Sequence, residues 1–114
     1  MQYIALIHAD QDGWEKLSED ERQSILQRYM NFSAKDEVVG GAELQETDNA
    51  TTVRVRNGDR LVTDGPYAEV KEALGGFFIL ECGSIDEACQ LAAEIPAAER
   101  GAVEVRPVVV REES

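Results

Sequence analysis

The segment at residues 63–76, TDGPYAEVKEALGG, holds the side chains of this sequence that are best suited to acid–base chemistry. It lies between two apolar runs, and loops of this composition place polar groups where solvent and ligands can reach them. Its carboxylates could accept a proton, and its ammonium group could neutralise an anionic substrate. The charged residues are Asp64, Glu69, Lys71 and Glu72.

Asp64 fits a structural role and a catalytic role equally well. In the run Asp-Gly-Pro, its carboxylate could accept hydrogen bonds from backbone amides two or three residues on, as an Asx turn or a helix cap. In a partly buried cavity its pKa would rise, and it could then serve as a general acid or base. The sequence leaves both alternatives open.

The other candidates of this kind are weaker. Glu69, Lys71 and Glu72 fit an exposed salt-bridged cluster, which is the commoner role of a charged loop. In the functional alternative, Lys71 binds an anionic substrate while a carboxylate moves a proton. His8 is the only histidine and lies at the end of the first apolar run. A lone histidine is more often structural than catalytic, but its near-neutral pKa suits proton transfer.

The composition is that of a single globular domain over residues 1–114. The net charge of −12 argues against nucleic acid as a partner, since phosphate binding needs a basic surface. It also disfavours anionic membranes, and no apolar run is long enough to span a bilayer. Because the N-terminus lacks the features of a signal peptide, we expect a cytoplasmic protein.

No metal or cofactor is expected. Cys82 and Cys89 do not form a CxxC pair, and one histidine is too few for a zinc site of the usual Cys/His type. We expect both thiols to be buried as small apolar residues. The pair Gly75-Gly76 lacks the spacing of a nucleotide-binding loop.

The elements that position these residues follow from local signals. The run Ser-Glu-Asp-Glu predicts a helix over residues 18–37, closed by the glycine pair at 40–41. The run Ser-Ile-Asp-Glu predicts a second helix over residues 84–95. Apolar runs predict the strands, and Asn57-Gly58 predicts a tight hairpin turn. Strands are expected at residues 2–8, 42–47, 51–57, 60–63, 77–82 and 102–110.

The order of these elements predicts an α+β fold, a ferredoxin-like βαββαβ plan with an extra hairpin strand. We expect strands 42–47 and 51–57 to pair with each other around residues 48–49. Both helices should cover one face of an antiparallel sheet. Pro107 lacks an amide hydrogen, so the last strand should end at the edge of regular pairing.

The second face of this sheet is expected to carry Arg54, Arg56, Glu104 and Arg106 among apolar neighbours. The arginines could pair with Glu104 across strands, or they could hold a carboxylate or phosphate through two hydrogen bonds. A face of this mixed kind is either solvated or covered. A symmetric homodimer that stacks two such sheets would cover it and enclose a cavity.

Three runs of the sequence carry a family resemblance. They are TDGPYAEVKE at residues 63–72, LGGFF at 74–78 and GAVEVRP at 101–107. These runs resemble the YCII-related proteins, and more closely their DGPF subgroup, which is named for an Asp-Gly-Pro-Phe tetrapeptide. Tyr67 stands where that name has phenylalanine. The resemblance covers nearly the whole chain and implies a ferredoxin-like fold assembled as a dimeric α/β barrel.

The resemblance implies little about the reaction, because the family is largely uncharacterised. Some YCII-like members have been proposed to use a His–Asp pair as an active site. Relatives of the DGPF group are associated with extracytoplasmic-function sigma factors.

Three functions remain open at this point. The first is a cofactor-free acid–base enzyme that acts on a small polar or anionic molecule in a dimer cavity. Asp64 would accept the proton, His8 would be its partner, and Lys71 or Arg106 would stabilise charge, with Glu69 and Arg54 as further substrate contacts. The second is a non-enzymatic ligand-binding or regulatory module. The third is a purely structural dimer.

Overall fold

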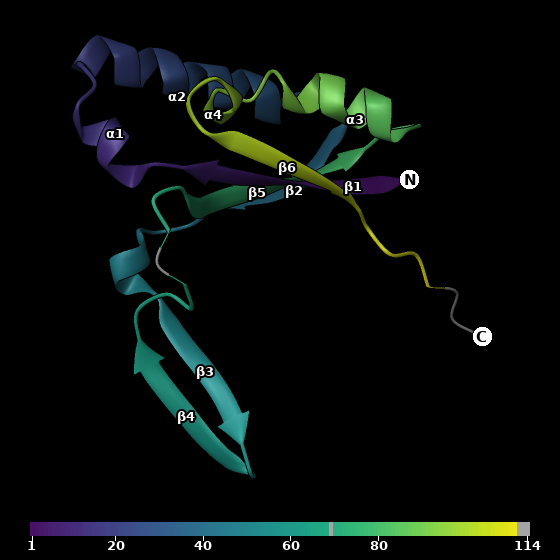
Figure 1. The fold of residues 1–114 in the computed structure, drawn as a ribbon. Coiled ribbons are helices and arrows are strands. Elements are labelled where there is room, and N and C mark those ends of the chain that lie inside the picture. Colours follow the sequence, from purple (N-terminus) through teal and green to yellow (C-terminus); the bar gives the residue numbers. More distant parts are fainter. Residues whose placement is uncertain (69, 112–114) are drawn as a thin grey trace.

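The computed structural model describes residues 1–68 and 70–111 as an α+β fold, shown in Figure 1. It contains a four-stranded sheet, a separate two-stranded hairpin and four α-helices. The elements are β1 (Gln2–Ala9), α1 (Gln11–Glu15), α2 (Glu19–Ser33), β2 (Val38–Glu43), β3 (Thr51–Arg56), β4 (Asp59–Asp64), β5 (Ala73–Glu81), α3 (Ile85–Ala92), α4 (Ala97–Arg100) and β6 (Ala102–Pro107), with a 3₁₀ turn at Thr47–Asn49.

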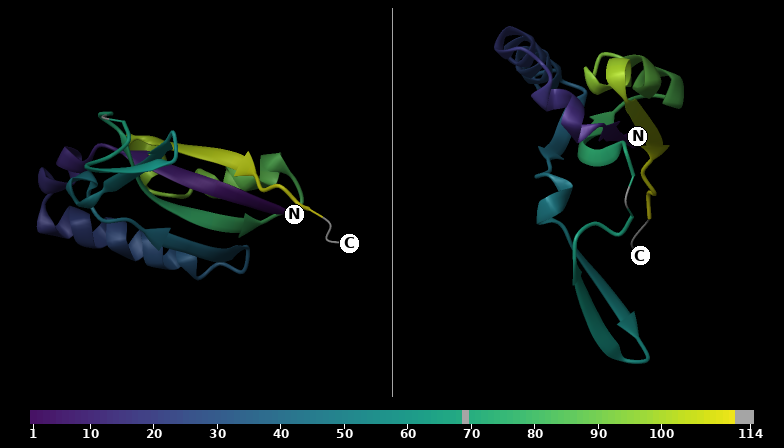
Figure 2. Two further views of the ribbon diagram at one scale, coloured as in Figure 1. Left: turned by 90° about the horizontal axis from the view of Figure 1, so that it is seen from below. Right: turned by 60° about the vertical axis from the view of Figure 1, so that its left-hand side comes forward.

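The larger sheet has the strand order β2-β5-β1-β6, and all neighbouring strands are antiparallel. The helices α2, α3 and α4 lie together on one side of it (Figures 1 and 2). This arrangement is consistent with a ferredoxin-like α+β fold. The predicted antiparallel sheet with helices on a single face is therefore confirmed. Among the residues that the structure describes, no helix is both long and apolar enough to span a bilayer.

The predicted pairing of residues 42–47 with 51–57 is wrong. Strand β2 begins at Val38 and pairs with β5, while β3 pairs with β4 along its whole length. The turn between β3 and β4 explains this choice, because Asn57 and Gly58 have φ angles of 53° and 82°. Two positive φ angles are what the tight hairpin turn of type I′ requires, so β3 finds its partner locally.

The predicted end of the first helix is also wrong. Helix α2 stops at Ser33, and residues beyond it form turns before β2 begins. The glycine pair that was expected to close the helix lies inside β2 instead. Gly41 has a φ of +155°, and a Cβ there would lie 2.6 Å from the carbonyl oxygen of Phe77. The glycine thus allows β2 to approach β5 closely.

The start of α2 and the end of β6 agree with the sequence. Ser18 accepts a hydrogen bond from the Glu21 amide at 3.1 Å, and Glu21 accepts one from the Ser18 amide at 3.2 Å, which completes the capping box. Strand β6 is one of the two outer strands of the sheet and ends at Pro107. It is shorter than the predicted strand, although the amide of Val108 still donates to the carbonyl of Gln2.

The hydrophobic core lies between the sheet and the helices. Successive strand residues point to opposite faces, so Tyr3, Ala5 and Ile7 of β1 all reach the helical side. There they meet side chains from both long helices and from β5. The buried partners include Phe32, Leu80, Leu91 and Ile95. This packing holds β1 and β6 in place beneath the helices and thereby fixes the opposite face of the sheet.

A bidentate ion pair on the surface ties α2 to α4. The Arg28 guanidinium donates to both carboxylate oxygens of Glu99, at 2.6 and 3.2 Å. This hydrogen bonding lowers the pKa of Glu99 below its ordinary value of 4.5. A carboxyl whose pKa is lower in the folded state stabilises the fold above its unfolded pKa, and that stabilisation is lost as the pH falls through the folded pKa.

We therefore expect the stabilising effect of Glu99 to disappear in acid. In urea denaturation, Glu99→Gln should unfold more readily than the wild type at neutral pH. The difference should shrink steadily as the pH falls below 4.5. Comparing the two proteins cancels the change in total charge, which affects both alike. A difference that grew on acidification would contradict the assignment.

Candidate functional site

The face of the sheet opposite the helices carries an apolar stripe across its two central strands. Ile4 of β1 lies beside Ile79 of β5, and Leu6 lies beside Phe77. All four side chains are half-buried even though none of the described helices covers this face. We refer to this surface as the open face. The neighbouring outer strand, β6, adds the polar side chains that border the stripe.

Three polar side chains form a chain of contacts on the open face. The His8 Nε2 atom lies 3.5 Å from Glu104 Oε1, and the Arg106 Nε atom donates to Glu104 Oε2 at 2.7 Å. Glu104 and Arg106 are two residues apart on β6, so they share a face of the sheet. Their register places Glu104 beside Leu6 and therefore diagonally next to His8. We call this arrangement the His8–Glu104–Arg106 chain.

The charge on Glu104 is fixed by its neighbours. The hydrogen bond from Arg106 is the largest cause of a lowered Glu104 pKa, and His8 contributes a smaller effect in the same direction. An anionic Glu104 can orient the imidazole of His8. The His8 side chain is 31% exposed, so the ring remains open to a molecule that approaches the open face.

Sequence reasoning named His8 and Arg106 but missed Glu104 as the link between them. It treated Glu104 only as a cross-strand partner of the arginines. The available signal was the spacing of Glu104 and Arg106 on one strand. Linking them to His8 also required the pairing of β6 with β1, which joins opposite ends of the chain.

Asp64 lies at the end of β4 and is exposed. In the part of the chain that the structure describes, its carboxylate takes part in no hydrogen bond or ion pair. The turn beside it is held instead by the Gly65 amide, which donates to the Ala50 carbonyl at 2.8 Å, and by Thr52 Oγ1, which donates to the Gly65 carbonyl at 2.9 Å. The predicted turn or cap hydrogen bonds of Asp64 are therefore not formed in the described part of the chain, whereas its catalytic role stays a prediction.

Arg54 and Arg56 do not lie on the sheet face that carries Glu104, which corrects the predicted placement. Both belong to β3, in the hairpin that is separate from the four-stranded sheet. The Arg54 guanidinium lies 5.2 Å from the centre of the Tyr67 ring, a cation–π contact. Arg54 therefore approaches the Asp-Gly-Pro-Tyr turn rather than Arg106.

Lys71 lines a different feature, a cleft of about 420 Å³ between α1, the 3₁₀ turn and the start of β5. The cleft is strongly acidic apart from Lys71, and its carboxylates come from Asp10, Asp12, Glu15, Glu46 and Asp48. The structure thus places Lys71 among carboxylates rather than in the His8–Glu104–Arg106 chain. Glu69, the other predicted contact in this loop, lies outside the described residues.

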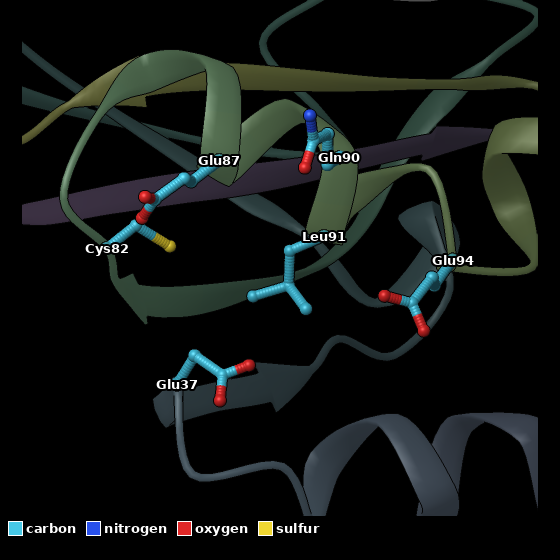
Figure 3. A pocket seen from close by; sticks show the side chains of 6 residues that line it. All are labelled: Glu37, Cys82, Glu87, Gln90, Leu91 and Glu94. Carbon is cyan, nitrogen blue, oxygen red and sulfur yellow. The ribbon is translucent and has the colours of Figure 1, made fainter.

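A smaller groove of about 280 Å³ lies beside α3 and is shown in Figure 3. Its carboxylates come from Glu37, Glu87 and Glu94, and the Cys82 thiol borders it. Burial raises the pKa of Cys82, so this thiol stays protonated and unreactive at neutral pH. The prediction that Cys82 is buried is confirmed.

The same prediction is wrong for Cys89, which is exposed on α3. Across residues 1–68 and 70–111, no group of three or more histidine, cysteine, aspartate or glutamate side chains is placed to hold a metal ion.

The sheet with helices on one side and a polar-edged stripe on the other defines a small α+β protein that is consistent with a ferredoxin-like fold. The chain belongs to the YCII-related domain family, whose model matches residues 1–112. An uncharacterized protein of Rhizobium meliloti (strain 1021) is similar to it, with 35% identity over 120 residues. That alignment covers 96% of this chain and 94% of the relative. The predicted resemblance to the YCII-related proteins is confirmed.

Proposed function

We propose that this protein binds a small polar or anionic molecule on the open face and performs cofactor-free acid–base chemistry with His8. The observation that carries the proposal is the His8–Glu104–Arg106 chain next to an apolar stripe. His8 would transfer the proton, Glu104 would orient the ring, and Arg106 would hold Glu104 and attract an anion. Asp64 is the competing proton acceptor.

The proposed site includes a second copy of the chain. The open face presents Ile4, Leu6, Phe77 and Ile79 without a helical cover, and a stacked second sheet would bury these residues. Stacked sheets lie about 10 Å apart, which leaves room for a small molecule where side chains are short or polar. We propose that the homodimer encloses this chamber as a dimeric α/β barrel.

Two further assignments belong to this proposal. Within the YCII-related family we place the chain in the DGPF subgroup, on the strength of Asp64, Gly65 and Pro66 followed by an aromatic residue. We also propose a cytoplasmic location, which is supported by the net charge of −12, since such a charge disfavours binding to anionic membranes.

The catalytic proposal can be tested by proton exchange. We would incubate the protein with a panel of small 2-oxo acids in D₂O and follow deuterium incorporation next to the carbonyl by NMR. The wild type should exceed the buffer rate, and His8→Gln should lose about 10²–10⁴-fold, the usual share of a general base. Glu104→Gln should lose less, because it removes only the group that orients His8.

Asp64→Asn serves as the comparison in the same experiment. If Asp64→Asn abolished exchange and His8→Gln did not, the role of base would pass to Asp64. Exchange that persisted in both variants would refute the assignment of either residue.

One observation favours a second function, ligand binding without turnover. Within the described part of the open face, His8 is the one imidazole, and its polar neighbours Glu104 and Arg106 are hydrogen-bonded to each other, which leaves no second free acid or base beside it. A regulatory module, which could include the sigma-factor association known for relatives, needs no more than this. Binding of a panel member without exchange would support that alternative.

A further inference from the structure

Among the residues that the structure describes, the hairpin of β3 and β4, residues 51–64, has strand pairing only within itself, and we call it the arm. Its six residue pairs run from Thr51 opposite Asp64 to Arg56 opposite Asp59. The arm projects from the sheet on the side away from the helices, as Figures 1 and 2 show. The Cα radius of gyration is 16.4 Å, whereas a compact chain of this length has about 13 Å. The arm therefore extends the molecule well beyond a compact shape.

One face of the arm is apolar and exposed. Val53 lies directly opposite Val62, and Val55 lies two residues further along the same face. These side chains are 59%, 57% and 61% exposed, respectively. A two-stranded hairpin alone is marginally stable in water, and three or more strands or a packing partner are usually needed. This valine face therefore has the character of a contact surface.

The reverse face of the arm is partly covered by the chain itself. Thr52 donates to the carbonyl of Gly65, and Arg54 lies over the ring of Tyr67. Both Thr52 and Arg54 are half-buried, in contrast to the valines. The difference between the two faces makes the valine face the one that is available to a partner.

The charge of the arm identifies the partner. Residues 51–64 hold three arginines and two aspartates, which gives the arm a net charge of +1. Because the whole chain has a net charge of −12, the residues outside the arm have a net charge of −13. Arg60 lies opposite Val55 and so stands beside the valine face. The complementary surface is therefore acidic with apolar parts, and the body of a second copy of this chain has that character.

The reach of the arm fits the same partner. Six strand residues span about 20 Å, and stacked sheets lie about 10 Å apart. An arm that leaves the sheet on the open side would pass the plane of a second sheet stacked there. Two copies related by a twofold axis would exchange this contact symmetrically.

We propose that the arm is a clasp that lies, valine face inward, against the body of a second copy of this chain. The clasp rests on the dimer of the proposed function, but it adds a contact that stacking of the open faces does not need. It also gives the arm its missing packing partner.

The test is the dissociation constant of the dimer, measured by sedimentation equilibrium from micromolar to millimolar protein. The double variant Val53→Glu/Val55→Glu should raise it by at least about tenfold, because carboxylates would enter an apolar contact beside an acidic surface. Leu61→Glu is the matched control, since Leu61 belongs to the same arm but points to the reverse face. It should change the constant by less than about threefold.

A variant that lacks the arm shows whether a loss of dimer affinity in the double variant arises from misfolding. The Gly65 amide already donates to the Ala50 carbonyl, so a short glycine link can replace residues 51–64 at a natural closure. This variant should keep the helical part of its circular dichroism spectrum, because no helix lies within residues 51–64, and it should lose dimer affinity to the same extent as the double variant.

Three results would overturn the clasp: a wild type that stays monomeric throughout, equal dissociation constants for all arm variants, or a larger effect of Leu61→Glu than of the valine pair. Leu6→Glu on the open face separates the two proposals. If Leu6→Glu prevents dimerisation and the arm variants do not, the stacked chamber is supported and the clasp is refuted. If the arm variants weaken the dimer while His8→Gln leaves proton exchange unchanged, the clasp is supported and the catalytic proposal is refuted.

Discussion

Replacing Leu80 with alanine is expected to lower the free energy of unfolding by about 2–5 kcal/mol. Leu80 lies on β5 and is 0% exposed, with Tyr3 on one neighbouring strand and Val38 on the other. The loss combines the transfer of the deleted methyl groups with the cost of the cavity that they leave. Close packing on both sides of β5 gives the surrounding residues little freedom to fill that cavity.

Urea denaturation of Leu80→Ala measures this effect, and Leu26→Ala provides the control. Leu26 lies on α2 and is 48% exposed, so its truncation should cost less than about 1 kcal/mol. A protein of this length has a total stability of about 5–15 kcal/mol, so the Leu80 variant should also unfold at a clearly lower temperature. Equal losses for the two variants would show that the sheet is not packed as described.

Gly101→Ala is expected to destabilise the protein by about 3 kcal/mol, at the upper end of the range for overpacking. Gly101 joins α4 to β6, and a Cβ there would overlap the carbonyl oxygen of His8. That oxygen belongs to backbone, and His8 is paired on both sides, with Leu74 of β5 and Ala102 of β6. The strain can be relieved only if β6 moves away from β1.

The same substitution tests the site, because movement of β6 would carry Glu104 away from His8. We expect the imidazole NMR signals of His8 to change along with stability. Gly75→Ala is the matched control, since a Cβ on Gly75 meets nothing within 4 Å. If both glycine variants behaved alike, the close approach between Gly101 and His8 would be refuted.

Local signals in the sequence were sufficient for much of this fold. The capping box at Ser18 set the start of α2, and Asn57-Gly58 set the hairpin turn of the arm. Both depend on atoms a few residues apart, so no knowledge of the tertiary structure was needed.

Signals that depend on distant pairing were less informative. The glycines at 40 and 41 looked like a helix end, but they serve the close approach of β2 to β5. The sequence also assigned Arg54 to the same sheet as Glu104. Alternation shows which residues share a face of a strand, but it does not show to which sheet the strand belongs. The pairing of each strand depends on which arrangement buries more apolar surface across the whole chain.

The sequence by itself determined the α+β class and most of the residues that could do chemistry, because these follow from local spacing and side-chain type. Its three motifs also carried the resemblance to the family. Only the tertiary structure decided that Glu104 links His8 to Arg106, and that Asp64, Lys71 and Arg54 lie elsewhere. The physical reason is that His8 and Glu104 meet through the antiparallel pairing of β1 with β6. That pairing is selected by the shared core of sheet and helices and not by any signal near either residue.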